Sequence, residues 1–95
     1  MRKKILAICG SGLGSSFLVQ MNIEKVLNEL GVKDVEVEHA DVGSAVVGAA
    51  DIFVFAKDIA EGLRLDAPTV VLDSIIDMDE LRTKMTQAVQ EYGLK

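Results

Sequence analysis

The stretch "KKILAICGSGLGSSFLVQ", residues 3–20, decides the fold of this chain. Its first part, 3–9, is a short continuous apolar run, which predicts a strand buried on both faces. Glycine and serine then dominate residues 10–16. From Ser16 to Leu30 the apolar residues recur with helical spacing, which predicts an amphipathic helix. A buried strand that leads through glycines into a helix indicates an α/β fold.

Further strands and helices alternate along the rest of the chain. The expected strands are 34–39, 51–56 and 69–73, and the expected helices are a weak one of small residues over 41–48, a short one from Asp58 to about Leu65, and a last one after Asp77. This alternation predicts a parallel sheet with helices on both faces. Residues 34–39 alternate in polarity, as edge strands do. Right-handed crossovers then favour a four-stranded sheet of order 2-1-3-4, a doubly wound three-layer sandwich that binds ligands where the order reverses.

Apolar stripes and capping residues define the helices. The first helix carries Val19, Ile23, Val26, Leu27 and Leu30 on one face, and the last carries Met78, Leu81, Met85, Val89 and Tyr92. Asp58 with Glu61, and Asp77 with Glu80, have the spacing of a capping box. Asp41 is likewise expected to cap the helix that follows it.

Composition limits the possible functions. The 95 residues predict one small domain, 1–95, with 49% hydrophobic and 26% charged residues, a balance typical of globular proteins. The net charge of −5 and the lack of a Lys/Arg stripe argue against nucleic acid and against an anionic membrane surface. One cysteine excludes an internal disulfide. With no signal peptide or membrane-spanning run in the sequence, we expect a cytoplasmic protein, and a monomer.

The single cysteine, Cys9, stands directly before the glycine-rich segment. The residues that follow it are Gly10, Ser11, Gly12, Leu13, Gly14, Ser15 and Ser16. Backbone N–H groups of such a loop, with the positive end of the following helix dipole, can hold an oxyanion or a thiolate. The same field favours the thiolate form of Cys9. One loop would thus activate a nucleophile and bind the phosphoryl group it receives, which indicates transfer through a phosphocysteine.

Other interpretations of this segment fit less well. A lone cysteine at the end of a buried strand is usually an inert core residue, but the glycine and serine spacing argues against that role. A dinucleotide-binding fingerprint lacks its final Gly or Ala, because Ser15 follows "GSGLG" (10–14). A Walker A loop is excluded because no lysine lies between Lys4 and Lys25. The acidic residues lack the clustering of a metal site, so no metal is expected.

The segments "ILAICGSGLGSSFLVQMNIEKVLNELGV" (5–32) and "DVGSA" (41–45) resemble the IIB components of the bacterial sugar phosphotransferase system, and among them the ascorbate-type branch. The resemblance implies that a IIA protein passes a phosphoryl group from its phosphohistidine to Cys9. Phospho-Cys9 would then donate the group to a sugar, L-ascorbate for this branch, held in the membrane-embedded IIC partner. The resemblance further implies that 10–16 bind the phosphate, that no metal or organic cofactor takes part, and that the protein associates transiently with the inner face of the membrane through IIC.

Two other function classes stay open. Low-molecular-weight tyrosine phosphatases and arsenate reductases have a similar fold and begin with Cys, a five-residue loop and Arg. Here Ser15 stands at the arginine position, so the bidentate clamp that stabilises the transferring phosphoryl group is missing. Asp73 or Asp77 can in principle act as a general acid. The other class is a IIB-like module that binds and regulates without catalysis.

Several residues near the loop are secondary candidates. Phe17 and Met21 lie one helical turn apart and face away from the apolar stripe, so with Leu13 they can form a patch that docks IIA and IIC. The alternative is that Phe17 and Met21 pack beneath the last helix. His39 is expected to be solvated or hydrogen-bonded rather than a second phosphoryl acceptor. Lys57 can reach an incoming phosphate, although a lysine at a strand end is more often simply solvated.

Overall fold

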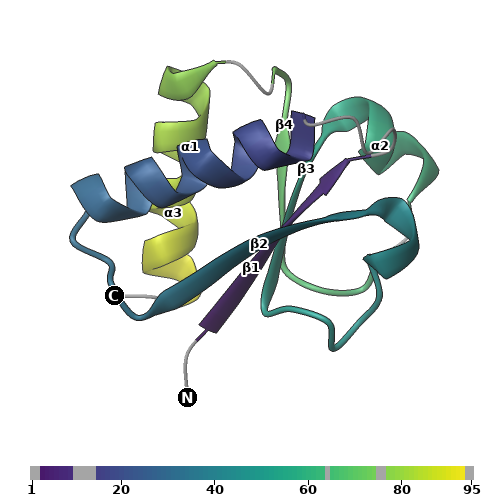
Figure 1. The fold of residues 1–95 in the computed structure, drawn as a ribbon, viewed down its shortest axis with the longest axis horizontal. Helices are drawn as coiled ribbons and strands as arrows, with labels where there is room; N and C mark the ends of the chain where they lie inside the picture. The colour runs from purple at the N-terminus through teal and green to yellow at the C-terminus, as the bar shows by residue number, and fades with distance from the viewer. Residues whose placement is uncertain (1–2, 10–14, 64, 75–76, 94–95) are drawn as a thin grey trace.

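The computed structural model describes residues 3–9, 15–63, 65–74 and 77–93. Its elements are β1 (Lys3–Cys9), α1 (Ser15–Glu29), β2 (Val35–Asp41), the 3-10 helix η1 (Val42–Ser44), β3 (Ile52–Ala56), α2 (Lys57–Gly62), β4 (Thr69–Leu72) and α3 (Met78–Glu91). Figure 1 shows α1 and α3 on one side of the sheet and α2 and η1 on the other. The three-layer α/β architecture expected from the sequence is confirmed.

The sheet has four parallel strands in the order β2-β1-β3-β4, as predicted. β1 therefore lies inside the sheet, with β2 on one side and β3 on the other. The chain passes from β1 to β2 on the first side, and β3 and β4 then add on the second. The order thus reverses at β1, and this reversal places the end of β1 where α/β sheets bind ligands.

β1 contributes to both hydrophobic cores because its side chains alternate between the two faces of the sheet. Ile5 and Ala7 pack into the core beneath α1 and α3, and Leu6 and Ile8 pack into the core on the α2 side. All four side chains are buried. The continuous apolar run of β1 follows from this burial on both faces.

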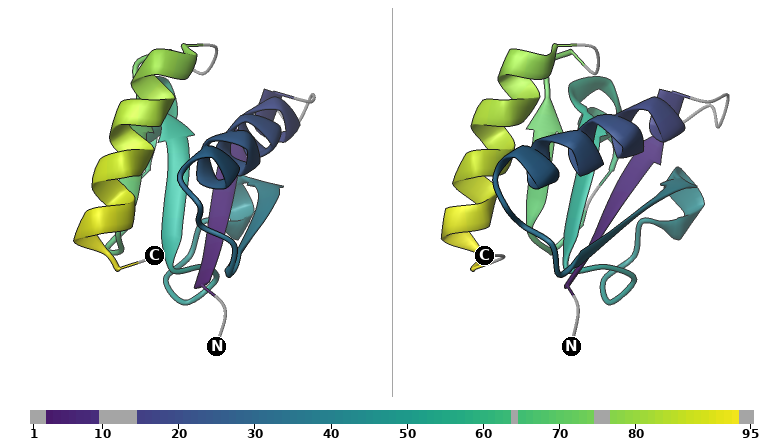
Figure 2. Two further views of the ribbon diagram at one scale, coloured as in Figure 1. Left: turned by 90° about the vertical axis from the view of Figure 1, so that its left-hand side faces the viewer. Right: turned by 60° about the vertical axis from the view of Figure 1, so that its left-hand side comes forward.

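The two long helices cover one face with the stripes predicted for them, and Figure 2 shows α1 and α3 side by side over the sheet. Their buried residues are Val19, Ile23, Val26 and Leu27 of α1 and Leu81, Met85, Ala88 and Val89 of α3, with Leu30, Met78 and Tyr92 partly buried at the same core. After α1 the chain turns at Gly31, whose φ of +76° favours glycine.

The helix predicted over 41–48 is wrong. Only Val42–Ser44 form a single turn of 3-10 helix. Gly43 and Gly48 weaken a helix here, and Gly48 adopts a φ of +94°, which no right-handed helix contains. Asp41 occupies the N-cap position of η1, but its side chain makes no capping hydrogen bond.

The capping prediction for α2 is also wrong, whereas that for α3 is partly confirmed. α2 starts at Lys57, directly after β3, so Asp58 lies inside the first turn, and the N-cap is Ala56. The helix ends at Gly62 rather than near Leu65. Asp77 does cap α3: its Oδ1 accepts from the Glu80 backbone N–H at 3.1 Å. The Glu80 carboxylate, however, bonds to other backbone groups than those of a capping box.

Candidate functional site

Cys9 ends β1 at the carboxyl edge of the sheet, which we define by the last residues of the four strands. Cys9 pairs with Asp41, the last residue of β2. The register of the other strands places Cys9 level with Ala56 and Leu72, which end β3 and β4. The four strands thus end at one level, and a group bound at Cys9 is bordered by the segments that leave the other three strands.

The predicted phosphate-binding segment lies largely outside the described residues. The residues outside the described ranges are Gly10, Ser11, Gly12, Leu13 and Gly14. Ser15 and Ser16 are the first two residues of α1. Because only five residues separate Cys9 from this helix, its N-terminus, the positive end of the helix dipole, faces the carboxyl edge. This orientation of α1 suits a helix that stabilises an anion near Cys9.

Three large apolar side chains are exposed on the outer face of α1. Phe17 and Met21 are each 50% exposed, and Leu18 is 41% exposed. The alternative that Phe17 and Met21 pack beneath the last helix is therefore wrong. We call Phe17, Leu18 and Met21 the α1 patch. Leu13, which was predicted to join them, lies outside the described residues.

His39 lies beside the α1 patch and is hydrogen-bonded, as expected. Its ring makes an edge-to-face contact with Phe17, with centroids 5.5 Å apart and planes at 67°. Gln20 Nε2 donates to the Val37 carbonyl at 3.0 Å, which leaves Gln20 Oε1 to accept from His39 Nδ1. This pairing fixes the orientation of the His39 ring against α1.

Charged side chains of both signs lie at the carboxyl edge, and most of them are acidic. Lys57 is exposed at the start of α2, one residue beyond the end of β3. Asp41, Asp58 and Asp73 are exposed at the same edge. Within residues 3–9, 15–63, 65–74 and 77–93, no group of three or more His, Cys, Asp or Glu side chains is arranged to hold a metal ion. Lys57 is thus a cation close to Cys9 along the sheet, in a mostly acidic setting.

Glu80 and Lys84 form a network at the end of β4. The Glu80 carboxylate accepts from the Asp73 backbone N–H at 2.7 Å, from the Ser74 N–H at 3.0 Å and from Lys84 Nζ at 2.8 Å. Lys84 Nζ also donates to the Val71 carbonyl at 2.5 Å. The Lys84 ammonium and the two N–H groups lower the pKa of Glu80 to about 2. The sequence indicates one part of this network, the ion pair between Glu80 and Lys84, because these residues have the i, i+4 spacing of a helical ion pair.

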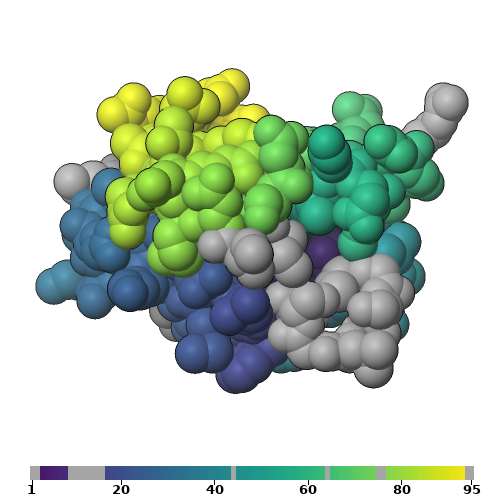
Figure 3. All heavy atoms as spheres, turned by 90° about the horizontal axis from the view of Figure 1, so that it is seen from above, coloured from purple at the N-terminus to yellow at the C-terminus, as the bar shows by residue number. Residues whose placement is uncertain are grey.

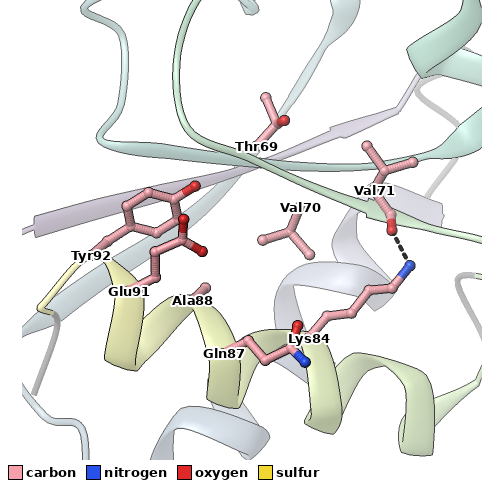
Figure 4. Close-up of a pocket in the computed structure, with 8 residues that line it drawn as sticks. All are labelled: Thr69, Val70, Val71, Lys84, Gln87, Ala88, Glu91 and Tyr92. Atoms are coloured by element: carbon pink, nitrogen blue, oxygen red, sulfur yellow. Dashed lines mark hydrogen bonds between the residues drawn. The ribbon is translucent and has the colours of Figure 1, made fainter.

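Two hollows lined by described residues do not include the end of β1. One, of about 170 Å³, runs between β4 and α3 and is lined by Thr69, Lys84 and Tyr92 among others (Figure 4). The other, of about 380 Å³, includes Lys3, Ile52 and Pro68, at the end of the sheet where the strands begin. Figure 3 shows the molecule from above the view of Figure 1, with the residues of α1 in blue and those of α3 in green to yellow. Of the helices in the described residues, none has both the length and the apolar character required to cross a membrane.

Comparisons with known proteins identify the relatives of this chain. A sequence model of the family described as "PTS system, Lactose/Cellobiose specific IIB subunit" matches residues 4–93. The chain is 29% identical over 82 residues to the ascorbate-specific PTS system EIIB component of Mycoplasma pneumoniae, covering 84% of this chain and 85% of that protein. Its fold is similar to the lactose-specific IIB domain of Streptococcus pneumoniae, with a TM-score of 0.62, 19% identity, and coverage of 97% of this chain and 99% of the other.

Proposed function

The chain belongs to the lactose/cellobiose-specific IIB family of the sugar phosphotransferase system, and we propose that it carries a phosphoryl group on Cys9. The donor is the phosphohistidine of a IIA protein, and the acceptor is a sugar held by a membrane-embedded IIC partner. The observation that carries this proposal is the position of Cys9: it is the only cysteine of the chain, and it ends β1 where the strand order reverses.

The proposed chemistry consists of two displacements at phosphorus. In the first, the Cys9 thiolate attacks the phosphoryl group, the S–P bond forms, and the N–P bond to the donor histidine breaks. The proton released when the thiol ionises is matched by one that the departing imidazole nitrogen takes up, so the donor histidine leaves as a neutral imidazole. In the second, a sugar hydroxyl attacks the same phosphorus, the S–P bond breaks, and the hydroxyl proton leaves to solvent or a base. The thiolate is then ready for another cycle.

We assign phosphate binding to Gly10, Ser11, Gly12, Leu13, Gly14, Ser15 and Ser16, the segment between Cys9 and the first turn of α1. Their backbone N–H groups and the dipole of α1 would stabilise the phosphoryl oxygens. This assignment is supported by the glycine content of the segment and by the orientation of α1. Because Ser15 stands where phosphatases have arginine, we expect slow hydrolysis, as a carrier requires.

The family and the exposed surface support a proposal for the partners and the sugar. We propose that the α1 patch docks IIA and, in a separate step, IIC at the cytoplasmic face of the membrane. The matched relative of Mycoplasma pneumoniae is ascorbate-specific, whereas the family description names lactose and cellobiose. We propose L-ascorbate, because the ascorbate-specific protein aligns over most of this chain.

Intact mass spectrometry tests the proposal. The protein and its Cys9→Ser variant are incubated with phosphoenolpyruvate, enzyme I, HPr and an ascorbate-type IIA protein. We expect one phosphoryl group on the wild type, stable to acid treatment that removes phosphohistidine, and none on the variant. Hydrolysis of p-nitrophenyl phosphate without such an adduct would favour the phosphatase alternative. Neither adduct nor hydrolysis would favour a regulatory binding module.

A further inference from the structure

The network around Glu80 ties the end of β4 to the first turns of α3. Glu80 binds two successive backbone N–H groups, those of Asp73 and Ser74, while Lys84 joins the Glu80 carboxylate to the Val71 carbonyl. The Glu80 side chain is only 13% exposed. Figure 4 shows Lys84 extending from α3 to Val71 along the outer edge of β4. The last residues of β4 and the two that follow are therefore held from the side by one helix.

This network lies at the carboxyl edge, level with Cys9. Ala7 pairs with Val54 of β3, so Cys9, two residues further, is level with Ala56. Ala56 pairs with Leu72, the residue directly before Asp73. Two strand spacings separate β1 from β4, which is about 10 Å. The Asp73–Ser74 backbone is thus a neighbour of the proposed phosphorylation site along the same edge.

A protein partner that covers Cys9 must also cover this neighbour. A standard protein–protein interface takes about 800 Å² from each partner, which corresponds to a disc of about 16 Å radius. A disc of this size centred on Cys9 includes the end of β4, about 10 Å away. If the Asp73–Ser74 backbone had to be ordered on docking, the complex would be weaker, because ordering backbone and side chains opposes association.

We propose that Glu80 and Lys84 are positioning residues for phosphoryl transfer. They fix the Asp73–Ser74 backbone in advance as part of the surface on which the phosphohistidine donor docks. This inference rests on the proposed carrier function, because it assumes that a partner protein covers Cys9. Neither side chain touches the phosphoryl group, so their loss should weaken docking of the donor and leave the chemical step unchanged.

The test measures the initial rate of Cys9 phosphorylation against the concentration of a phosphorylated ascorbate-type IIA protein. For Glu80→Gln and Lys84→Met we expect the half-saturating donor concentration to rise about tenfold, with the maximal rate within about twofold of wild type. Lys84→Arg, which keeps the cation, should stay close to wild type. Amide hydrogen exchange at Asp73 and Ser74 should accelerate in the first two variants.

Arg82→Met is the matched control. Arg82 lies on the same helix and also forms carboxylate ion pairs, with Glu29 at 2.9 Å and Asp79 at 3.2 Å, but it has no contact with the end of β4 among those described. We expect its donor dependence to match that of the wild type.

If Glu80→Gln and Lys84→Met show wild-type donor dependence, or if Arg82→Met shows the same rise in half-saturating donor concentration, the positioning role is overturned. If Glu80→Gln fails to fold, the comparison of Lys84→Met with Lys84→Arg decides. If the wild type accepts no phosphoryl group, the proposed function itself fails, and the inference fails with it.

Discussion

Phe17 and Ile23 lie on different faces of α1, so substitutions at these two positions separate the proposed docking role of the helix from its structural role. Phe17 is half exposed, whereas Ile23 is fully buried beneath the helix. We predict that Phe17→Ser lowers the free energy of unfolding by about 1 kcal/mol, since the half-exposed side chain loses only its partial packing and the His39 contact. Transfer from IIA should slow about fivefold or more, as for an interface anchor.

Ile23→Ala provides the contrast on the same helix. Removing its buried side chain should cost about 2–5 kcal/mol in chemical denaturation, because a cavity remains in the core. Phosphoryl transfer by the folded fraction should stay near the wild-type rate. A Phe17→Ser protein that unfolds as readily as Ile23→Ala would show that Phe17 belongs to the core, against the exposure seen here.

Glu80 makes part of the stability depend on acid. Its pKa is lowered to about 2 by the Lys84 ammonium and by the backbone N–H groups of Asp73 and Ser74. The folded state therefore holds the ionised form more strongly than the unfolded chain does, and the stabilisation is complete above the ordinary value of 4.5. As the pH falls from about 4.5 toward 2, the unfolded chain binds the proton first and the stabilisation is lost.

Thermal melts of the wild type and Glu80→Gln between pH 2 and pH 7 measure this effect. We predict that the wild type melts at a higher temperature above pH 5 and that the difference shrinks as the pH falls below 4.5. Glu29→Gln is the comparison, because its pKa is also lowered, by Arg82, but this pair is exposed. Salt should therefore reduce the Glu29 effect more than the Glu80 effect. A pH-independent difference for Glu80→Gln would contradict the assignment.

At the scale of secondary structure, two pairs of acidic residues with the same capping-box spacing differ in whether they cap a helix. Asp58 with Glu61 and Asp77 with Glu80 both fit a capping box, but only Asp77 caps a helix. α2 begins at Lys57, directly after β3, so its N-cap is Ala56, which is extended but has no side chain that can accept a hydrogen bond, and Asp58 lies inside the first turn. Asp77 comes after a connection of several residues and has extended backbone, with φ −87° and ψ 100°. Whether the helix begins directly after the aspartate, rather than the Asp–Glu spacing alone, decides whether the aspartate caps it.

Substitution of the two aspartates tests this difference. We predict that Asp77→Ala lowers the free energy of unfolding by about 1 kcal/mol, through loss of the bond to the Glu80 N–H, while Asp77→Asn retains most of it. Asp58→Ala should cost less than about 0.5 kcal/mol, since only its favourable place near the helix N-terminus is lost. Urea denaturation of the three variants gives the comparison. Equal losses for Asp58→Ala and Asp77→Ala would contradict the capping geometry.

For the whole molecule, the strand order and the two cores could be predicted because they follow from local patterns and general topology. The apolar run of β1 indicated burial on both faces, and the alternation of β2 indicated an edge. The contacts of Gln20 and Glu80 could not be predicted from the sequence, because each joins a side chain to a group whose position depends on the folded backbone. Gln20 lies 17 residues from Val37 and 19 from His39, and no local pattern connects them.

Contacts of Gln20 and Lys84 bear on the association state, because through them a helix side chain bonds a backbone carbonyl of each edge strand. Gln20 Nε2 bonds the Val37 carbonyl of β2, and Lys84 Nζ bonds that of Val71 in β4. Side chains that engage edge strands, and charges along them such as Glu36 and Glu38, disfavour pairing with another chain. We predict a monomer in sedimentation velocity at all concentrations up to about 0.5 mM, a range in which weak edge pairing would be visible. The Gln20→Ala, Lys84→Met double variant should shift toward a dimer at the highest concentration, and Arg82→Met should not. A dimeric wild type would show that these contacts do not protect the sheet edges.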